Sequence, residues 1–208
     1  MTGRDALTSS RQAFEVVDAF EQAVARYTGA PYCVAVDSCC NALVMVLCTA
    51  RDRFKTISLP RRTYVGVAMA AKAVGMQIEW RDEEWTGIYQ VRPIGIFDAA
   101  KRFTSGMYLP GTYMCLSFQA SKLLPIGRGG AILHDNPDFN QWARRARNNG
   151  RAEGALCGQE TDFPHLGWNM GMTPPDAARG LWLLTYYPEH MPDQVDVYED
   201  LSQVELFK

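Results

Sequence analysis

The sequence lacks the features that mark several classes of protein. No apolar run approaches the roughly 18 residues that a membrane-spanning helix needs, and the first residues lack the apolar core of a signal peptide. The six cysteines include no Cys-x-x-Cys pair, so neither a zinc ribbon nor a disulfide framework is indicated. Neither sign of charge dominates, because 21 Lys and Arg residues face 23 Asp and Glu residues. We therefore expect a cytoplasmic protein with reduced thiols, and the net charge indicates no nucleic-acid or membrane partner.

The remaining composition is typical of one globular domain. The chain has 208 residues, 47% of them hydrophobic, and a domain of this size buries roughly 70% of the surface that its unfolded chain exposes. The three histidines, His134, His165 and His190, show no spacing typical of metal ligands, so we expect no metal site. We expect one α/β domain over residues 1–187, followed over residues 188–208 by an acidic arm that is solvated or contacts a second copy of the chain.

Hydrophobic periodicity predicts helices that alternate with short strands. Apolar residues recur every three to four positions from Arg11 to Tyr27, as in an amphipathic helix. Short apolar or β-branched runs predict strands in the segments YCVAV, KTISLP, QIEW, PIGIFDAA, TYMCLSF and GGAILH. Further helices are predicted in the segments NALVMVLCTAR, TYVGVAMAAKAVG, WARRARNNG and PDAARGLWLLTYY. Strands that alternate with helices favour a mostly parallel sheet wrapped by helices.

Polar clusters lie where four of these strands end. They are Ser38 to Asn41, Arg61 to Tyr64, Asp98, and Ser117 to Lys122. In open α/β sheets the carboxyl ends of the strands and the helix N-termini that follow them form the ligand crevice. We therefore expect these four clusters to converge.

Each cluster taken alone leaves its chemistry open. Backbone N–H groups after Ser38 are suited to a phosphate, although an ordinary helix cap is the alternative. Asp98 ends an apolar strand and needs a partner there, either a structural arginine or the protonated ring nitrogen of a cofactor. Lys122 is either a solvated surface residue or an amine that condenses with an aldehyde, its pKa lowered by a partly apolar pocket.

Taken together with the aromatic residue Tyr64, these are the parts that pyridoxal 5'-phosphate requires. Lys122 would hold the aldehyde carbon as a Schiff base, and Asp98 would keep the pyridine nitrogen protonated. Tyr64 would cover the ring, and the helix N-terminus would bind the phosphate. The combination therefore predicts pyridoxal 5'-phosphate as the cofactor.

The residues also resemble, in the same order, the pyridoxal-phosphate-dependent sugar aminotransferases of the DegT/DnrJ/StrS type. The matching segments are FEQAVARYTGAPYCVAVDSCCNAL, LPRRTYVGVAMAAKAVG, IFDAAKRF, SFQASKLLPIGRGGAIL, ARRARNNGR and LGWNMGMTPPDAARGLWLL. The likeness covers about residues 12–187. It implies a reduced form of the fold-type-I large domain, in a shortened member that lacks the C-terminal small domain with which relatives enclose the substrate.

The resemblance implies a role for each matching residue. Lys122 would be the Schiff-base lysine and proton carrier, and Asp98 would pair with the pyridine nitrogen, which makes both catalytic residues. The other cofactor contacts that it implies within one chain are Ser38, Cys39, Cys40, Tyr64, Lys101 and Ser117. Asn169 matches an asparagine that reaches the phosphate of the neighbouring subunit, which implies a homodimer with shared active sites.

The cysteines of the phosphate turn depart from the family pattern. Cys39 and Cys40 stand where a Gly-Thr pair is usual, and they place two thiols at a helix N-terminus. Because the helix dipole favours the thiolate, we expect unusually acidic thiols.

The sequence leaves three functions open. The first is an aminotransferase for a sugar or another small carbonyl substrate. The second is a decarboxylase or other lyase for a bulky amino-acyl, nucleotide or nucleic-acid-linked substrate. In that case arginines would bind the phosphates, unless they only form a solvated helix face. These arginines are Arg61, Arg62, Arg144, Arg145, Arg147 and Arg151. The third is a non-catalytic relative.

Overall fold

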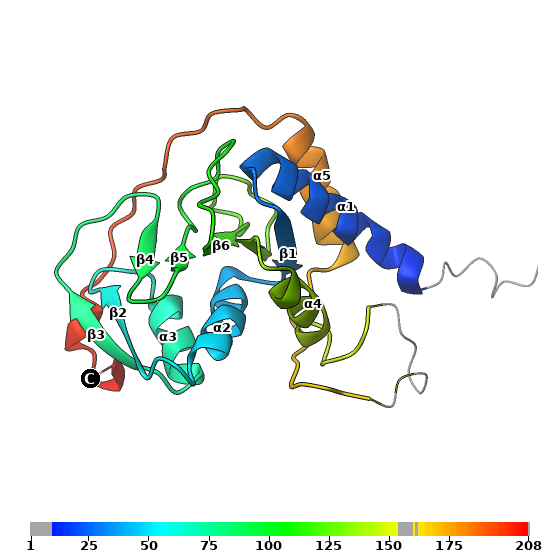
Figure 1. Cartoon of the computed structure of the whole chain (residues 1–208). Helices are drawn as coiled ribbons and strands as arrows, with labels where there is room; N and C mark the ends of the chain where they lie inside the picture. The colour runs from blue at the N-terminus through cyan, green and yellow to red at the C-terminus, as the bar shows by residue number, and fades with distance from the viewer. Residues whose placement is uncertain (1–9, 154–159, 161, 208) are drawn as a thin grey trace, which may run out of the picture.

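The structure is a computed structural model that describes residues 10–153, 160 and 162–207. Within these residues the chain folds into a sheet with helices on both faces (Figure 1). The helices are α1 (Ser10–Thr28), α2 (Cys39–Ala50), α3 (Val65–Ala73), α4 (Pro137–Ala146) and α5 (Pro174–Thr185). The strands are β1 (Tyr32–Val36), β2 (Thr56–Pro60), β3 (Gln77–Arg81), β4 (Tyr89–Val91), β5 (Ile96–Asp98), β6 (Tyr113–Ser117) and β7 (Gly130–His134).

The main sheet has five strands in the order β1-β7-β6-β5-β4. β5 and β6 are parallel, with Ile96 opposite Tyr113, and the other three ladders are antiparallel. A separate parallel pair, β2 and β3, adjoins the edge of this sheet. One bridge joins it to the end of β4, where Ser58 and Arg92 exchange backbone hydrogen bonds of 2.7 and 3.2 Å.

The expected α/β class is present, but the expectation of mostly parallel strands is wrong for the main sheet. Parallel neighbours need a crossover of roughly a dozen residues or more, usually a helix. Only residues 92–95 lie between β4 and β5, so these two strands form a hairpin. Residues 118–129 form a loop without a helix, and β7 therefore returns antiparallel to β6. The sequence pattern also did not predict β4.

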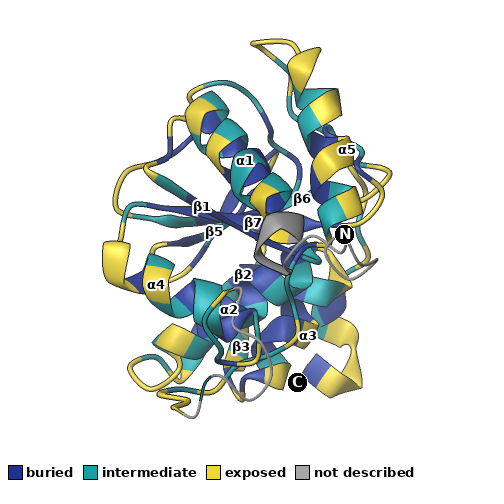
Figure 2. Ribbon diagram, turned by 90° about the vertical axis from the view of Figure 1, so that its right-hand side faces the viewer, coloured by how far each residue is buried: buried dark blue, intermediate teal, exposed yellow. Residues whose placement is uncertain are grey.

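Side chains alternate between the two faces of the sheet, as the two-residue period of a strand requires. On β1, Val34 and Val36 belong to the cluster formed with α2, α3 and α4, whereas Cys33 and Ala35 belong to the cluster formed with α1 and α5. Figure 2 shows the buried residues between the exposed outer sides of the helices. The sheet is therefore covered on both faces.

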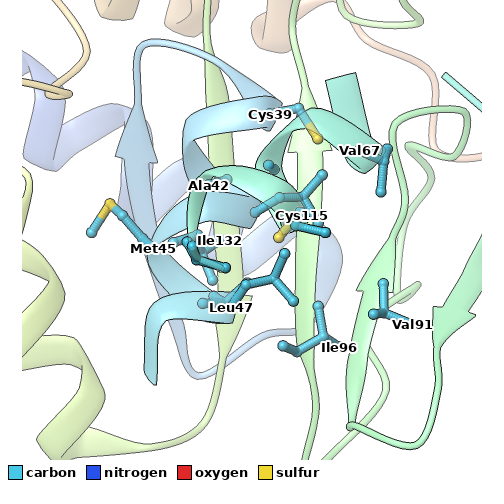
Figure 3. Packing of buried hydrophobic residues seen from close by; sticks show 14 of the residues in the cluster. Cys39, Ala42, Met45, Leu47, Val67, Val91, Ile96, Cys115 and Ile132 are labelled. Atoms are coloured by element: carbon cyan, nitrogen blue, oxygen red, sulfur yellow. The ribbon is translucent and has the colours of Figure 1, made fainter. Parts of the chain in front are cut away.

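Helix α2 fills the centre of the first of these clusters. Figure 3 shows Ala42 and Leu47 of this helix beside Ile96, Cys115 and Ile132 of the sheet. Burying a side chain such as that of Leu47 or Ile96 contributes about 1.5–3 kcal/mol to the free energy of folding. This packing holds the N-terminus of α2 at the edge of the sheet where β5 and β6 end.

Capping side chains explain where the helices begin. Ser38 precedes α2 and accepts the N–H of Asn41 at 3.2 Å. Asn136 precedes α4 and accepts the N–H of Phe139 at 3.0 Å, and Pro137 occupies the first turn, where its missing N–H has no cost. None of the described helices is long and apolar enough to cross a membrane.

Strand β7 passes very close to the turn before α2. A Cβ atom on Gly130 would lie 2.4 Å from the carbonyl carbon of Ser38 and 2.5 Å from the backbone nitrogen of Cys39. These are backbone atoms and cannot rotate away as a flexible side chain does. Glycine at this position therefore allows the turn before α2 to rest directly on the sheet.

We expect Gly130→Ala to lower the free energy of unfolding by about 1–3 kcal/mol, the usual effect of overpacking. Urea unfolding followed by circular dichroism measures this change. Gly95→Ala is the matched control, because its added Cβ would lie 3.6 Å from the carbonyl oxygen of Gly111, an ordinary contact. Equal effects of the two substitutions would contradict the close approach at Gly130.

Candidate active site

The predicted clusters meet around one cavity of about 200 Å³. β1, β5 and β6 run in the same direction, since β5 is parallel to β6 and both β1 and β6 are antiparallel to β7. Their carboxyl ends therefore lie at one edge of the sheet. The predicted site residues that line the cavity are Ser38, Cys39, Cys40, Tyr64, Asp98, Lys101, Ser117 and Lys122.

The N-terminus of α2 forms an electropositive wall of the cavity. The Ser38 hydroxyl caps the helix and donates to the Asp37 carboxylate at 3.3 Å. Arg128 lies on the same side, with its guanidinium 3.1 Å from Asp37 and its side chain 72% exposed. The first N–H groups of a helix have no partner within the helix, and the dipole adds positive charge there. Ser38 therefore caps the helix and also lines the cavity.

The thiols at this turn are not acidic. Burial raises the pKa of Cys39 well above its ordinary value, and the negative charge of Asp98 raises it further. Burial also raises the pKa of Cys40. The expectation of unusually acidic thiols is therefore wrong, because the loss of water around the sulfur outweighs the helix N-terminus.

Asp98 is a carboxylate in the wall of the cavity, only 4% exposed. It accepts the N–H of Ala100 at 2.9 Å and a hydrogen bond from the hydroxyl of Tyr89. Burial raises the pKa of Asp98, and these donors and the nearby Lys122 and Lys101 only partly offset the effect. The carboxylate thus lacks full compensation for the water that it has lost.

Backbone hydrogen bonds close the loop that carries Lys122. The N–H of Phe118 donates to Gly129 at 2.9 Å, and the N–H of Gly127 donates back to Phe118 at 3.1 Å. Gly127 and Gly129 have φ angles of 120° and 147°, which residues other than glycine rarely adopt. The glycines therefore shape a closed loop with Lys122 at the cavity.

Lys101 lies beside Lys122 in the cavity and is almost completely buried. Burial and the positive charge of Lys122 lower the pKa of Lys101 to about 8. The ammonium group of Lys101 forms an ion pair with Asp196.

The cavity also contains side chains that the sequence analysis missed. The polar and aromatic ones are Asp37, Trp85, Gln119, Arg128 and Tyr198. Asp37, Gln119 and Arg128 lie next to or inside the predicted motifs, which was the available signal. Trp85 and Tyr198 follow no predicted strand end. Their rings stack on each other with centroids 5.8 Å apart and planes 13° apart.

Tyr198 belongs to residues 189–200, which we call the strap. Figure 1 shows the chain after α5 running past β4 toward β3. Along this path the strap contacts its own chain, through the Lys101–Asp196 pair and through an Arg102–Asp193 pair of 2.6 Å. Of these residues, Tyr198 lines the cavity. The expectation that the segment is a solvated arm or a dimer contact stays a prediction.

Asn169 does not line this cavity. It forms a β-bridge with Asn148 and lines a second cavity of about 570 Å³, together with Arg147 and Glu153. Asn169 is therefore not placed to contact a cofactor bound in the cavity of its own chain.

Most of the arginines considered as phosphate ligands have carboxylate partners. Arg144 lies 2.6 Å from Glu21. Arg147 is buried, pairs with Glu21 and donates to the carbonyl oxygen of Ala35 at 2.6 Å. The further pairs are Arg61–Asp82, Arg62–Asp82, Arg145–Glu160 and Arg147–Glu153. Arg147 is thus a packing residue, and these pairs give no support to a nucleic-acid surface.

A model of the DegT/DnrJ/EryC1/StrS aminotransferase family matches residues 5–86 and 104–204. The chain belongs to this family. The gap inside the match, residues 87–103, contains Asp98 and Lys101, so their assignment depends on the geometry of the cavity. Comparison with curated proteins finds no match.

Solved structures of aminotransferases share the fold. The sugar aminotransferase CalS13 from Micromonospora echinospora is 20% identical, with a TM-score of 0.73 over 83% of this chain and 60% of its own. AtS13 from Actinomadura melliaura is 23% identical, with a TM-score of 0.71 over 88% of this chain and 65% of its own. PseC from Helicobacter pylori, an aminotransferase involved in the biosynthesis of pseudoaminic acid, is 16% identical, with a TM-score of 0.68 over 87% and 63%.

These likenesses show that this family member has the fold-type-I architecture. The chain spans less than two thirds of the length of each of the three solved chains.

The buried carboxylate gives a prediction for stability. Because burial raises the pKa of Asp98, its ionised form costs the folded state free energy that a neutral amide does not. We expect Asp98→Asn to raise the Tm of the cofactor-free protein at pH 7, by roughly 2–4 °C for each kcal/mol gained. The gain should shrink as the pH falls, because Asp98 itself then takes up a proton.

Thermal unfolding at several pH values measures this difference. Asp52→Asn, at an exposed turn position, is the control and should change the Tm little. A Tm that is unchanged or lowered by Asp98→Asn at pH 7 would rule out an uncompensated carboxylate.

Proposed function

We propose that the chain is a pyridoxal-phosphate-dependent aminotransferase that acts on a sugar or another small carbonyl substrate, with an amino acid as amino donor. One observation carries the proposal: Lys122, the buried carboxylate of Asp98 and the N-terminus of α2 all line one cavity. Membership of an aminotransferase family supports it.

The residues of the cavity fit this cofactor. Asp98 forms no ion pair within the described part of the chain, and a protonated ring nitrogen is the charge partner that it lacks. The start of α2, whose first N–H groups have no partner within the helix, is suited to a phosphate, and Arg128, paired with Asp37, lies beside it. Ser117 adds a hydroxyl at the end of β6.

Each side chain then has a defined task. The Nζ atom of Lys122 is the point of covalent attachment and, as a free amine, moves the proton at the substrate carbon. The Asp98 carboxylate holds the proton of the ring nitrogen. Tyr64, Trp85 and Tyr198 line the site with aromatic surface. When bound, pyridoxal phosphate supplies a ring that accepts electrons from the substrate carbon.

The two alternative functions have less support. A lyase for nucleic-acid-linked substrates needs unpaired basic residues, whereas Arg61 and Arg144 pair with carboxylates. A non-catalytic relative has no need of a lysine beside a buried carboxylate. The structural neighbour CalS13 is a sugar aminotransferase, which agrees with a sugar substrate for this chain.

The assembly and location are part of the same proposal. Asn169 lies outside its own cavity, which supports a homodimer in which it contacts the cofactor of the partner. The cysteines at 33, 39, 40, 48 and 115 form no disulfide, which supports a cytoplasmic location.

Covalent labelling of Lys122 tests the cofactor. We expect borohydride reduction of the protein loaded with pyridoxal phosphate to leave a stable adduct on Lys122, located by peptide mass spectrometry. Lys122→Ala should lose the adduct and the visible absorption of the bound aldehyde. Lys72→Ala in α3, outside the cavity, should keep both. An adduct on other lysines alone would refute the assignment.

The reaction type is tested with glutamate. We expect the absorption of the loaded protein to change from that of the cofactor aldehyde to that of the amine, with one 2-oxoglutarate formed per cofactor converted. Release of carbon dioxide without a keto acid would identify a decarboxylase instead.

A further inference from the structure

The strap is held at both of its ends. Near its start, the N–H of Ser105 donates to the carbonyl oxygen of Glu189 at 3.0 Å. Just beyond its end, the N–H of Leu201 donates to the carbonyl oxygen of Arg61 at 2.9 Å, and both Leu201 and Phe207 are buried. The middle of the strap is therefore confined to the neighbourhood of the cavity.

Two aspartates of the strap reach the two basic residues that follow β5. Asp193 binds Arg102 through both carboxylate oxygens, at 2.9 and 2.6 Å, and Asp196 binds Lys101. Between them, the N–H of Gln194 donates to the carbonyl oxygen of Lys101 at 2.9 Å. The strap is thus in register with residues 101 and 102.

The two ion pairs differ in where they lie. Lys101 lines the cavity and its side chain is 4% exposed, whereas the side chain of Asp196 is 45% exposed. Arg102 and Asp193 do not line the cavity. Asp196 therefore brings a carboxylate from the solvent side to a buried ammonium group, while Asp193 only fastens the strap outside.

Tyr198 completes the surroundings of this carboxylate. Its hydroxyl donates to Asp196 at 3.2 Å, and the Nζ of Lys101 lies 6.0 Å from the centre of its ring. The ring is fixed by its stacking on Trp85. A carboxylate at this point thus meets an ammonium group and a hydroxyl, a pair of donors suited to an anion.

We propose that Lys101 and Tyr198 form a binding site for the carboxylate of the amino-acid donor, and that Asp196 occupies this site until the donor replaces it. The proposal rests on the proposed function, because it places the donor by its amine at Lys122. In an α-amino acid one carbon separates the amine from the carboxylate. Lys101 is the lysine directly beside Lys122, and so it is suitably placed for that carboxylate.

The exchange keeps the buried charge of Lys101 paired. Removing a carboxylate from a buried ammonium group without replacement is strongly unfavourable, whereas replacing it with another carboxylate conserves the pair. A tethered group competes at an effective concentration of roughly the millimolar range. An amino acid present at similar concentrations therefore displaces Asp196, and carbonyl compounds without an anionic group at this position do not.

Binding of succinate, which has carboxylates and no amine, tests the proposal without turnover. We expect calorimetry on the cofactor-loaded protein to show at least about fivefold tighter binding for Asp196→Asn than for the unmodified chain. Asp193→Asn is the matched control, because it weakens the outer fastening and leaves Lys101 paired. Its affinity for succinate should stay within about twofold of the unmodified chain. Equal tightening by both variants, or by neither, would overturn the proposal.

Hydrogen exchange supplies a second measurement on the unmodified chain. We expect succinate to speed exchange at the amide of Gln194, which bonds to Lys101, and to leave that of Leu201 unchanged. Slower or unchanged exchange at Gln194 contradicts displacement of the strap. The borohydride adduct on Lys122 distinguishes failure of this proposal from failure of the proposed function. If the adduct forms and the succinate experiments fail, only the carboxylate site is refuted. If no adduct forms, both proposals fail.

Discussion

The site depends on one constraint, the burial of the Asp98 carboxylate. β5 ends at this residue, and the packing of α2 against the sheet removes water from it. A buried anion is stabilised by nearby cations and hydrogen-bond donors, and here Tyr89, Lys101 and Lys122 lie around the carboxylate. The same charge raises the pKa of Cys39 and keeps that thiol neutral. The three-residue strand β5 therefore places the charge that shifts the pKa values of its neighbours in the cavity.

Much of the fold could be predicted from the sequence, because long elements carry a periodic pattern. The helix expected over residues 11–27 is α1, Ser10–Thr28, and each of the six segments predicted as a strand contains one. β4 escaped prediction because three residues, Tyr89–Val91, are too few to show a period. The pairing of β4 with β5 and the antiparallel direction of β7 depend on tertiary contacts, which a local sequence pattern does not contain.

The cavity could be predicted in part for a related reason. Strand-end motifs near Ser38, Asp98 and Lys122 converge because parallel strands share an edge. Trp85 and Tyr198 could not be found in this way. Trp85 reaches the cavity on the segment between β3 and β4, and Tyr198 reaches it on the strap. The course of the strap depends on contacts with residues about 95 positions away in the sequence, as between Lys101 and Asp196. Thiol acidity was misjudged because burial is invisible in a local motif.

The anchoring of the strap at both ends has a consequence for how it moves. A free tail that detaches must search a large volume before it returns, whereas a segment with fixed ends bows outward and settles back over the same path. Tyr198 is held by its stacking on Trp85, so the exchange proposed above displaces Asp196 and leaves the aromatic wall in place. A strap with both ends fixed thus opens the site without dismantling the wall beside it.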